Sequence, residues 1–201
     1  MLLKVKTFFE KIDSQRDRLL FGVIRKCWPR FILPNHLTIL RIVIAVCLFS
    51  AMFWGFKQQP AIVIIFLFAA LLDLLDGSVA RALNKTSKIG AVLDSAADKV
   101  LILPMAIFIL YQNYFWLLFF LILPEIFSWL GSVFFQIIGR VVQVTIFGKV
   151  KMVMQCAGFF LILSIYPKEP PYIAICFLYL AVLFAFASVA LNIISPPPKR
   201  Q

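Results

Sequence analysis

The stretch LLDLLDGSVARALNKTSKIGAVLDSAADKV, residues 71–100, decides how this chain is interpreted, because it places carboxylates between apolar runs. It contains four aspartates: Asp73, Asp76, Asp94 and Asp98. Hydrophobic residues make up 63% of the 201 residues, and 22 of them are Phe. A soluble domain of this length has too little interior to bury so much apolar surface. The composition therefore favours a membrane protein, in which helices satisfy their own backbone hydrogen bonds.

Apolar runs on both sides of the stretch approach or exceed the ~18–20 residues that cross a bilayer core as a helix. We expect six spans, at roughly 37–56, 60–82, 90–111, 114–137, 149–166 and 172–194. The second and third should continue as helices beyond the hydrocarbon at their aspartate ends. No strand alternation typical of a barrel is evident. The prediction is an all-α membrane protein, with a six-helix domain over residues 32–195 and a flexible tail over 196–201.

Residues 1–31 mix basic and apolar side chains and predict an amphipathic helix lying on the membrane surface. A solvated basic leader is the alternative. The net charge of +11 fits the positive-inside rule and anionic headgroups better than a nucleic-acid partner. Most basic residues outside the spans or at their ends fall on one predicted side, which places both termini and the aspartate stretch in the cytoplasm: Lys4, Lys6, Lys11, Arg16, Arg18, Arg25, Lys26, Arg30, Lys85, Lys88, Arg140, Lys149, Lys151, Lys199 and Arg200.

The aspartates occupy matched positions on two antiparallel helices. Asp73 precedes Arg81 by eight residues and Asp98 follows Gly90 by eight, so each lies ~12 Å from the cytoplasmic end of its helix at ~1.5 Å per residue. The spacings i, i+3 and i, i+4 put each pair on one helix face. Four such carboxylates repel one another unless cations are bound. Ordinary helix-packing polar residues are the alternative interpretation.

A carboxylate cluster without His or Cys ligands suits Mg²⁺ or Mn²⁺ rather than zinc. Two such ions about 3.5–4 Å apart can clamp the attacking and leaving oxygens of a phosphoryl displacement. We therefore expect a divalent metal site, with two ions, formed by the four aspartates.

The stretch resembles the signature of the CDP-alcohol phosphotransferases. Its residues match the pattern D-x2-D-G-x2-A-R-x8-G-x3-D-x3-D at every fixed position. The resemblance implies transfer of a phosphatidyl or similar group from a CDP-linked donor to an alcohol, with release of CMP. It implies that Asp73, Asp76 and Asp94 hold the metals, and that Asp98 contacts a metal and acts as general base. It also implies contacts to the cytidine diphosphate from Gly77, Ala80, Arg81 and Ser87, although Arg81 also reads as a positive-inside flank.

Two further stretches resemble parts of these enzymes. In PNHLTILR, residues 34–41, the resemblance places Thr38 and Asn35 at the nucleotide site, although Asn35 could equally cap the first helix. FGKVKMVMQ, residues 147–155, is similar to the G-K-x-K-T-x-x-Q stretch of phosphatidylglycerophosphate synthases. There Lys149 and Lys151 would bind an acceptor phosphate, with Arg140 nearby; a positive-inside flank is the alternative.

One departure from that subfamily is Pro124-Glu125, where an Arg-Glu pair is usual. The expected activity is metal-dependent transfer of a phosphatidyl group from CDP-diacylglycerol to glycerol 3-phosphate, in phospholipid biosynthesis. Inositol phosphate, serine or another alcohol are alternative acceptors. An intramembrane prenyltransferase and a cation transporter are more distant alternatives. The expected partners are membrane lipid and the two substrates, in a prokaryotic cell membrane, with a homodimer suggested only by the resemblance.

Overall fold

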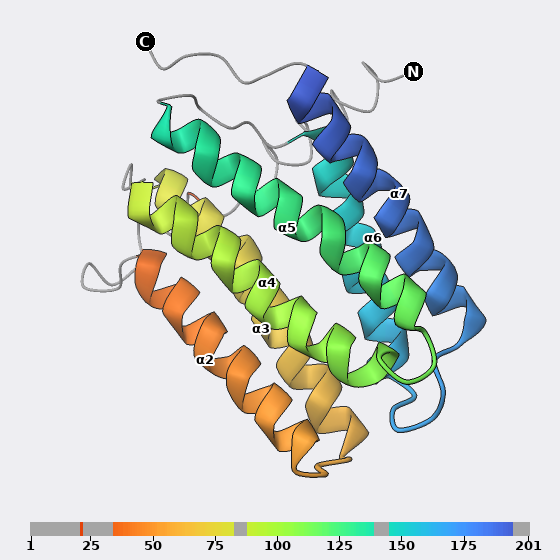
Figure 1. Cartoon of the computed structure of the whole chain (residues 1–201). Helices are drawn as coiled ribbons and strands as arrows, with labels where there is room; N and C mark the ends of the chain where they lie inside the picture. Colours follow the sequence, from red (N-terminus) through yellow and green to blue (C-terminus); the bar gives the residue numbers. More distant parts are fainter. Residues whose placement is uncertain (1–20, 22–33, 83–87, 139–144, 195–201) are drawn as a thin grey trace. The chain divides into compact units, whose positions relative to one another are not determined.

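The computed structural model describes residue 21 and residues 34–82, 88–138 and 145–194. Within these ranges the secondary structure is entirely helical, which confirms the all-α prediction for them (Figure 1). Each predicted span overlaps one helix. The helices of the described ranges are α2 (Pro34–Phe53), α3 (Gln59–Ala82), α4 (Lys88–Leu110), α5 (Phe115–Ile137), α6 (Ile146–Leu163) and α7 (Tyr172–Ile194).

Two helix boundaries differ from the sequence-based expectation for identifiable local reasons. α2 ends at Phe53 rather than near residue 56, and Gly55 follows it with φ of 89°. This left-handed conformation is open to glycine and terminates helices. α6 begins at Ile146 rather than at 149, because the Thr145 hydroxyl accepts a hydrogen bond from the Gly148 N–H at 3.1 Å and caps the helix.

Four helical stretches of the described chain are long and apolar enough to cross a membrane: Asn35–Phe53, Phe115–Phe135, Ile146–Leu163 and Tyr172–Ile194. The other two helices have shorter apolar stretches, Gln59–Asp73 in α3 and Lys99–Leu110 in α4. In both helices the apolar part stops at the aspartate motif. Except for residue 21, the predicted amphipathic segment 1–31 and the tail 196–201 lie outside the described residues, and the domain boundaries stay a prediction.

The exterior of the described helices is unusually apolar for a protein in water. Large apolar side chains are exposed on every helix, including Val43, Ile64, Ile107, Phe127 and Leu183. The buried polar and charged residues among those described are Thr38, Arg41, Ser78, Glu125 and Gln155. An apolar exterior of this extent suits contact with lipid, and polar groups are then placed where other protein groups can satisfy them.

The chain divides into two compact units, one of Met1–Trp54 and Ile64–Ile102 and the other of Gly55–Val63 and Leu103–Gln201. In the first unit, α2 and α3 pack through a small apolar cluster. Leu37, Leu72 and Val79 are buried in it, and Phe21 and Ile44 pack against them. This cluster flanks the beginning of α2 and the motif-bearing part of α3, so it supports the helix faces that carry the site.

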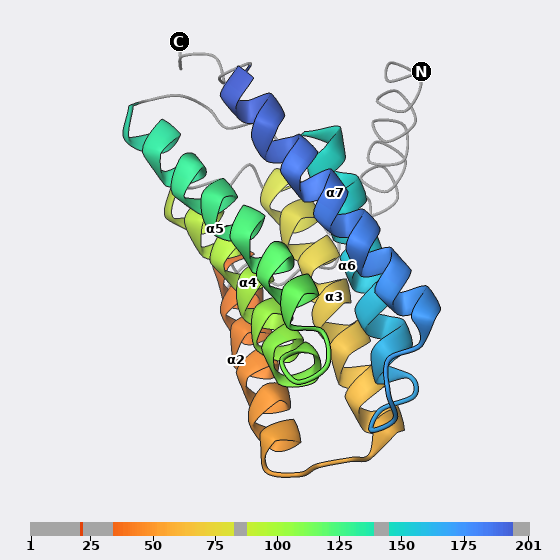
Figure 2. The ribbon, with the colours of Figure 1, turned by 45° about the vertical axis from the view of Figure 1, so that its right-hand side comes forward.

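In the second unit, α7 packs against both α5 and α6, and Figures 1 and 2 both show α6 and α7 side by side. Gly158 on α6 lies against Leu178 and the carbonyl of Ala174 on α7. Small residues at such a position let two helix backbones approach closely. In the link after α6, Tyr166 packs on Phe108, and burial raises the pKa of its phenol.

Candidate active site

The aspartate motif lies on two unbroken helices. α3 runs through Asp73 and Asp76 to Ala82, and α4 runs from Lys88 through Asp94 and Asp98. The helical backbone therefore gives each pair the shared face that the spacing predicts. Asp76, Asp94 and Asp98 are described by their backbone alone. The same holds for three predicted donor-binding residues on α3: Gly77, Ala80 and Arg81.

Asp73 is the motif aspartate whose side chain is described, and it forms an ion pair with Arg41. The Arg41 guanidinium contacts Asp73 Oδ1 through Nη1, which joins α2 to α3. The Arg41 side chain has no exposed area, whereas that of Asp73 is 13% exposed. A buried guanidinium is tolerated only with a carboxylate partner, because the loss of hydration otherwise costs several kcal/mol. α2 therefore supplies a fixed cation to the first aspartate of the motif.

Thr38 lies three residues before Arg41, on the same face of α2, and is buried at 4% exposure. Ser78 on α3 is fully buried, two residues after Asp76. Asn35 is half-buried and lies inside the first turn of α2, because the helix begins at Pro34. Proline is well suited to the first helical position, since no N–H is needed there. Asn35 therefore does not occupy the capping position before the helix.

Some predictions at this site concern residues or side chains that the structure does not describe. Ser87 and Arg140 lie outside the described residues, and the side chain of Arg81 is among those described by backbone alone. Among the described side chains, no group of three or more His, Cys, Asp or Glu lies close enough to hold a metal ion. Of the four predicted metal ligands, only Asp73 is among these described side chains, so the statement does not cover the other three aspartates.

The chemistry of the donor set fits a hard divalent cation. The motif offers carboxylates alone, the ligands that Mg²⁺ and Mn²⁺ prefer. The Arg41 contact shows that Asp73 is held against a positive charge. That contact uses Oδ1 of the carboxylate, and a carboxylate has two oxygens that can each accept. Asp73 can therefore serve Arg41 and a metal ion together.

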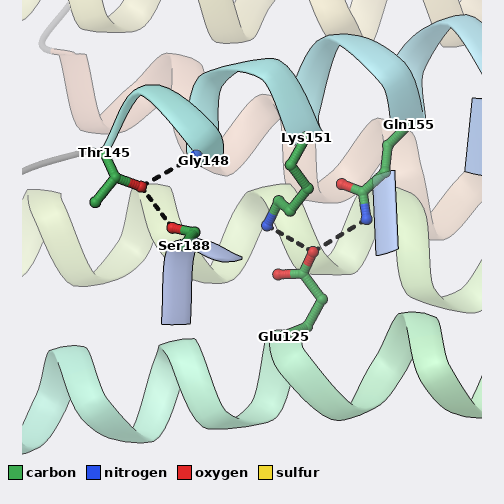
Figure 3. Close-up of polar contacts among 6 residues, drawn as sticks. All are labelled: Glu125, Thr145, Gly148, Lys151, Gln155 and Ser188. Carbon is green, nitrogen blue, oxygen red and sulfur yellow. Dashed lines mark hydrogen bonds and ion pairs between the residues drawn. The ribbon is translucent and has the colours of Figure 1, made fainter. Parts of the chain in front are cut away.

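A second polar cluster joins α5 to α6 and includes one predicted acceptor residue (Figure 3). Lys151 Nζ donates to Glu125 Oε1 at 2.7 Å, and Gln155 Nε2 donates to the same oxygen at 3.1 Å. Lys151 and Gln155 are i, i+4 on α6, so both reach Glu125 from one helix face. Glu125 and Gln155 are buried, with 7% and 2% of the whole residue exposed. We call Glu125, Lys151 and Gln155 the Glu125 cluster.

The first turn of α6 is fixed by hydrogen bonds on both sides. Thr145 Oγ1 accepts from the Gly148 N–H, and it lies 2.5 Å from Ser188 Oγ of α7 (Figure 3). Lys149 follows Gly148 and is half-buried. The N-terminal end of a helix carries a partial positive charge. Lys149 and Lys151 therefore lie in a part of the chain that favours an anion.

Sequence reasoning did not single out Arg41, Glu125 or Gln155 as site residues. A signal existed for Glu125, since a carboxylate in an apolar helix is usually functional. Arg41 offered the same kind of signal, because it interrupts the apolar run of α2. Their partners are distant in the chain, however, and the pairing follows from how the helices pack.

The fold and these clusters define an all-helical protein with an apolar exterior, carboxylates at the ends of two helices and a lysine-bearing helix start. Comparison with known proteins refines that class. The family model of the CDP-alcohol phosphatidyltransferases matches residues 31–190. This region includes every described helix except the last turn of α7, and the chain belongs to that family.

Several relatives share the name CDP-diacylglycerol--glycerol-3-phosphate 3-phosphatidyltransferase. The protein of Wigglesworthia glossinidia brevipalpis is 30% identical and that of Pectobacterium atrosepticum 27%, each over 80% of this chain and 92% of the relative. The protein of Blochmanniella floridana is 36% identical over 45% of this chain. This chain spans about half the length of that relative, 48%, and 49% of the one from Haemophilus influenzae.

Proposed function

We propose that this protein transfers the phosphatidyl group of CDP-diacylglycerol to glycerol 3-phosphate and releases CMP. One observation carries the proposal: the complete aspartate motif lies on unbroken helices inside the region that matches the family. The names of the relatives indicate the donor and the acceptor. Membership of this family argues against the two more distant alternatives, a prenyltransferase and a cation transporter.

The acceptor hydroxyl is a poor nucleophile until its proton is removed. We assign that role to Asp98, whose carboxylate takes the proton as the oxygen attacks the phosphorus that bears the diacylglycerol. A new P–O bond forms to glycerol 3-phosphate, and the P–O bond to CMP breaks. CMP leaves with the bridging oxygen.

The donor diphosphate needs positive charge around it. Asp73, Asp76, Asp94 and Asp98 would hold two Mg²⁺ or Mn²⁺ ions, which supply charge neutralisation for the diphosphate and the departing CMP. Arg81 would bind phosphate oxygens through its several N–H donors. Gly77 and Ala80 on the same helix lack bulk and leave room for the nucleotide.

On the acceptor side, Lys149 and Lys151 would bind the phosphate of glycerol 3-phosphate by charge-assisted hydrogen bonds. Their position at the beginning of α6 adds the favourable end of the helix dipole. Arg140 and the donor-side residues Ser87, Asn35 and Thr38 complete the proposed set. Pro124 stands where the usual arginine would be, so the lysines bear more of the recognition.

For the membrane arrangement, we propose six spans, with the shorter apolar stretches of α3 and α4 extended by their motif-bearing turns. The excess of basic residues would place both termini and the active site at the cytoplasmic face of a bacterial cell membrane. Residues 1–31 would lie on that face as an amphipathic helix. The homodimer stays a prediction that rests on family resemblance.

An assay of CMP release tests the proposal. Purified protein in detergent micelles is incubated with CDP-diacylglycerol, Mg²⁺ and one acceptor: glycerol 3-phosphate, inositol phosphate, serine or glycerol. The lipid product is identified by its mass in mass spectrometry. We expect CMP and a phosphatidylglycerophosphate product with the first acceptor. EDTA should stop the reaction, and excess Mg²⁺ should restore it.

The outcomes separate the parts of the proposal. Turnover with inositol phosphate or serine alone would replace the acceptor and keep the reaction class. Turnover that survives EDTA would exclude the metal. Folded protein that releases no CMP with any acceptor would overturn the proposed function. The Glu169→Gln variant, in the exposed link before α7, serves as a control that should behave as the wild type does.

A further inference from the structure

Glu125 is placed where an unpaired carboxylate would be costly. Its side chain is 9% exposed, and it lies in the middle of α5, an otherwise strongly apolar helix. A buried charge of this kind requires a partner of opposite sign and further hydrogen bonds. Lys151 provides the charge and Gln155 provides a second donor, both to the same oxygen. The Glu125 carboxylate thus accepts hydrogen bonds from two side chains of α6.

Lys151 has the longest and most flexible side chain in this cluster. A lysine ends in a compact ammonium on a flexible four-carbon stem, so its position is poorly defined unless something holds it. The 2.7 Å contact to Glu125 holds the Lys151 ammonium, and the Lys151 side chain as a whole is 18% exposed. An ammonium has three N–H donors, and the bond to Glu125 uses one of them. The held lysine can still present donors to an anion.

The first turn of α6, which precedes Lys151, is held in place by its own hydrogen bonds. Thr145 caps the helix, and Ser188 on α7 lies beside the cap, so the turn that precedes Lys151 is anchored independently of Glu125. Lys149 is in the same turn. Glu125 is the buried member of the cluster, while Lys151 is the member with greater exposure. The Lys151 side chain is therefore partly accessible while its ammonium contacts a buried carboxylate.

We infer that Glu125 is a positioning residue for the acceptor: it holds the Lys151 ammonium where the phosphate of the acceptor binds, and Gln155 holds Glu125. This inference rests on the proposed function. Glu125 itself carries the wrong charge to touch a phosphate, so it acts through Lys151. Loss of its charge should weaken binding of the phosphorylated acceptor while leaving the lipid donor unaffected.

Steady-state kinetics of four proteins test the inference: wild type, Glu125→Gln, Lys151→Gln and the double variant. Glutamine keeps the size of Glu125 and an acceptor oxygen but loses the charge. We expect KM for glycerol 3-phosphate to rise about tenfold in Glu125→Gln, as for loss of a hydrogen bond between charged groups. KM for CDP-diacylglycerol should change by less than about twofold, because the proposed function assigns the donor to other residues.

The double variant distinguishes positioning from a separate contribution. If Glu125 acts only through Lys151, the double variant should match Lys151→Gln within about twofold. If the fold-increase in KM for glycerol 3-phosphate in the double variant equals the product of the two single increases, the inference is overturned. An unchanged KM for glycerol 3-phosphate in Glu125→Gln would also overturn it. A parallel rise of both KM values with a lower Tm would identify a purely structural role. Glu169→Gln and Lys168→Gln, both in the exposed link after α6, are the matched controls.

A binding measurement without turnover keeps this test separate from that of the proposed function. Lysines are acylated with a water-soluble reagent in the presence and absence of glycerol 3-phosphate, and modification of Lys151 is measured by mass spectrometry. We expect the acceptor to protect Lys151 in the wild type and to protect it several-fold less in Glu125→Gln. Failure of the wild type to release CMP refutes the proposed function, whereas absence of protection in the wild type overturns this inference.

A second variant covers the case in which Glu125→Gln does not fold. Gln155→Met removes the other donor to Glu125 Oε1 and leaves the Lys151 pair in place. We expect a rise of about threefold in KM for glycerol 3-phosphate, smaller than in Glu125→Gln because the charged pair with Lys151 remains. An unchanged KM in folded Gln155→Met, with Lys151 protection equal to that of the wild type, would overturn the inference.

Discussion

The guanidinium of Arg41 on α2 pairs with the carboxylate of Asp73 on α3, so the first aspartate of the motif already has a cationic partner within the protein. Thirty-two residues separate the two in sequence. The pair explains how an apolar helix tolerates a fully buried arginine. It also gives Asp73 a defined orientation before any metal ion arrives.

The Arg41→Met variant should lose stability because Asp73 loses its partner. Breaking a fully buried pair costs 3–5 kcal/mol, and we expect about 2–3 kcal/mol here because the Asp73 side chain is 13% exposed. Thermal unfolding in detergent measures the change. Mg²⁺ should restore part of the lost Tm if Asp73 is a metal ligand. Lys57→Met, which removes an exposed cation, should leave Tm unchanged.

The Asp98→Asn variant should separate binding from chemistry. Asparagine keeps the size of the side chain but cannot take the proton of the acceptor hydroxyl, so we expect kcat to fall by a factor of about 10²–10⁴. Stabilisation of the protein by CDP-diacylglycerol should remain, because in the proposed function the other three aspartates would still hold the metal and the donor. Normal turnover in Asp98→Asn would show that another group acts as the base.

The contact between α6 and α7 depends on the absence of a side chain at Gly158. An added Cβ would lie 2.9 Å from Leu178 Cδ2 and 3.3 Å from the Ala174 carbonyl oxygen. Leu178 is fully buried and has little room to move. Overpacking costs ~1–3 kcal/mol and outweighs the gain of ~1 kcal/mol in helix propensity. Gly158→Ala should therefore lower Tm in thermal unfolding.

The matched control for this substitution is Gly131→Ala on α5. Apart from its chain neighbours and the backbone of its own helix, no atom of the described residues lies within 4 Å of the position that a Cβ would take there. The helix-propensity gain is then unopposed, and Tm should stay the same or rise. Equal effects at the two glycines would mean that packing against α7 does not decide the result at Gly158.

Much of the architecture was predictable because it depends on local patterns. The apolar runs predicted each of the six described helices to within a few residues, and the Asp73 and Asp76 spacing predicted a shared face on α3. The ends were less predictable. Gly55 ends α2 through its backbone conformation, and Thr145 begins α6 through a side-chain cap, three residues away from the expected positions in each case.

The candidate site also combines features that the sequence predicts with pairings that only the structure shows. The sequence alone determined the aspartate motif, its helical spacing and the lysines at the beginning of α6, because hydropathy and periodicity act within one helix. Only the tertiary structure decided that Arg41 meets Asp73, and that Glu125 meets Lys151 and Gln155. Such pairs depend on the rotation and register of packed helices, which side-chain interdigitation sets and which no pattern within one helix contains.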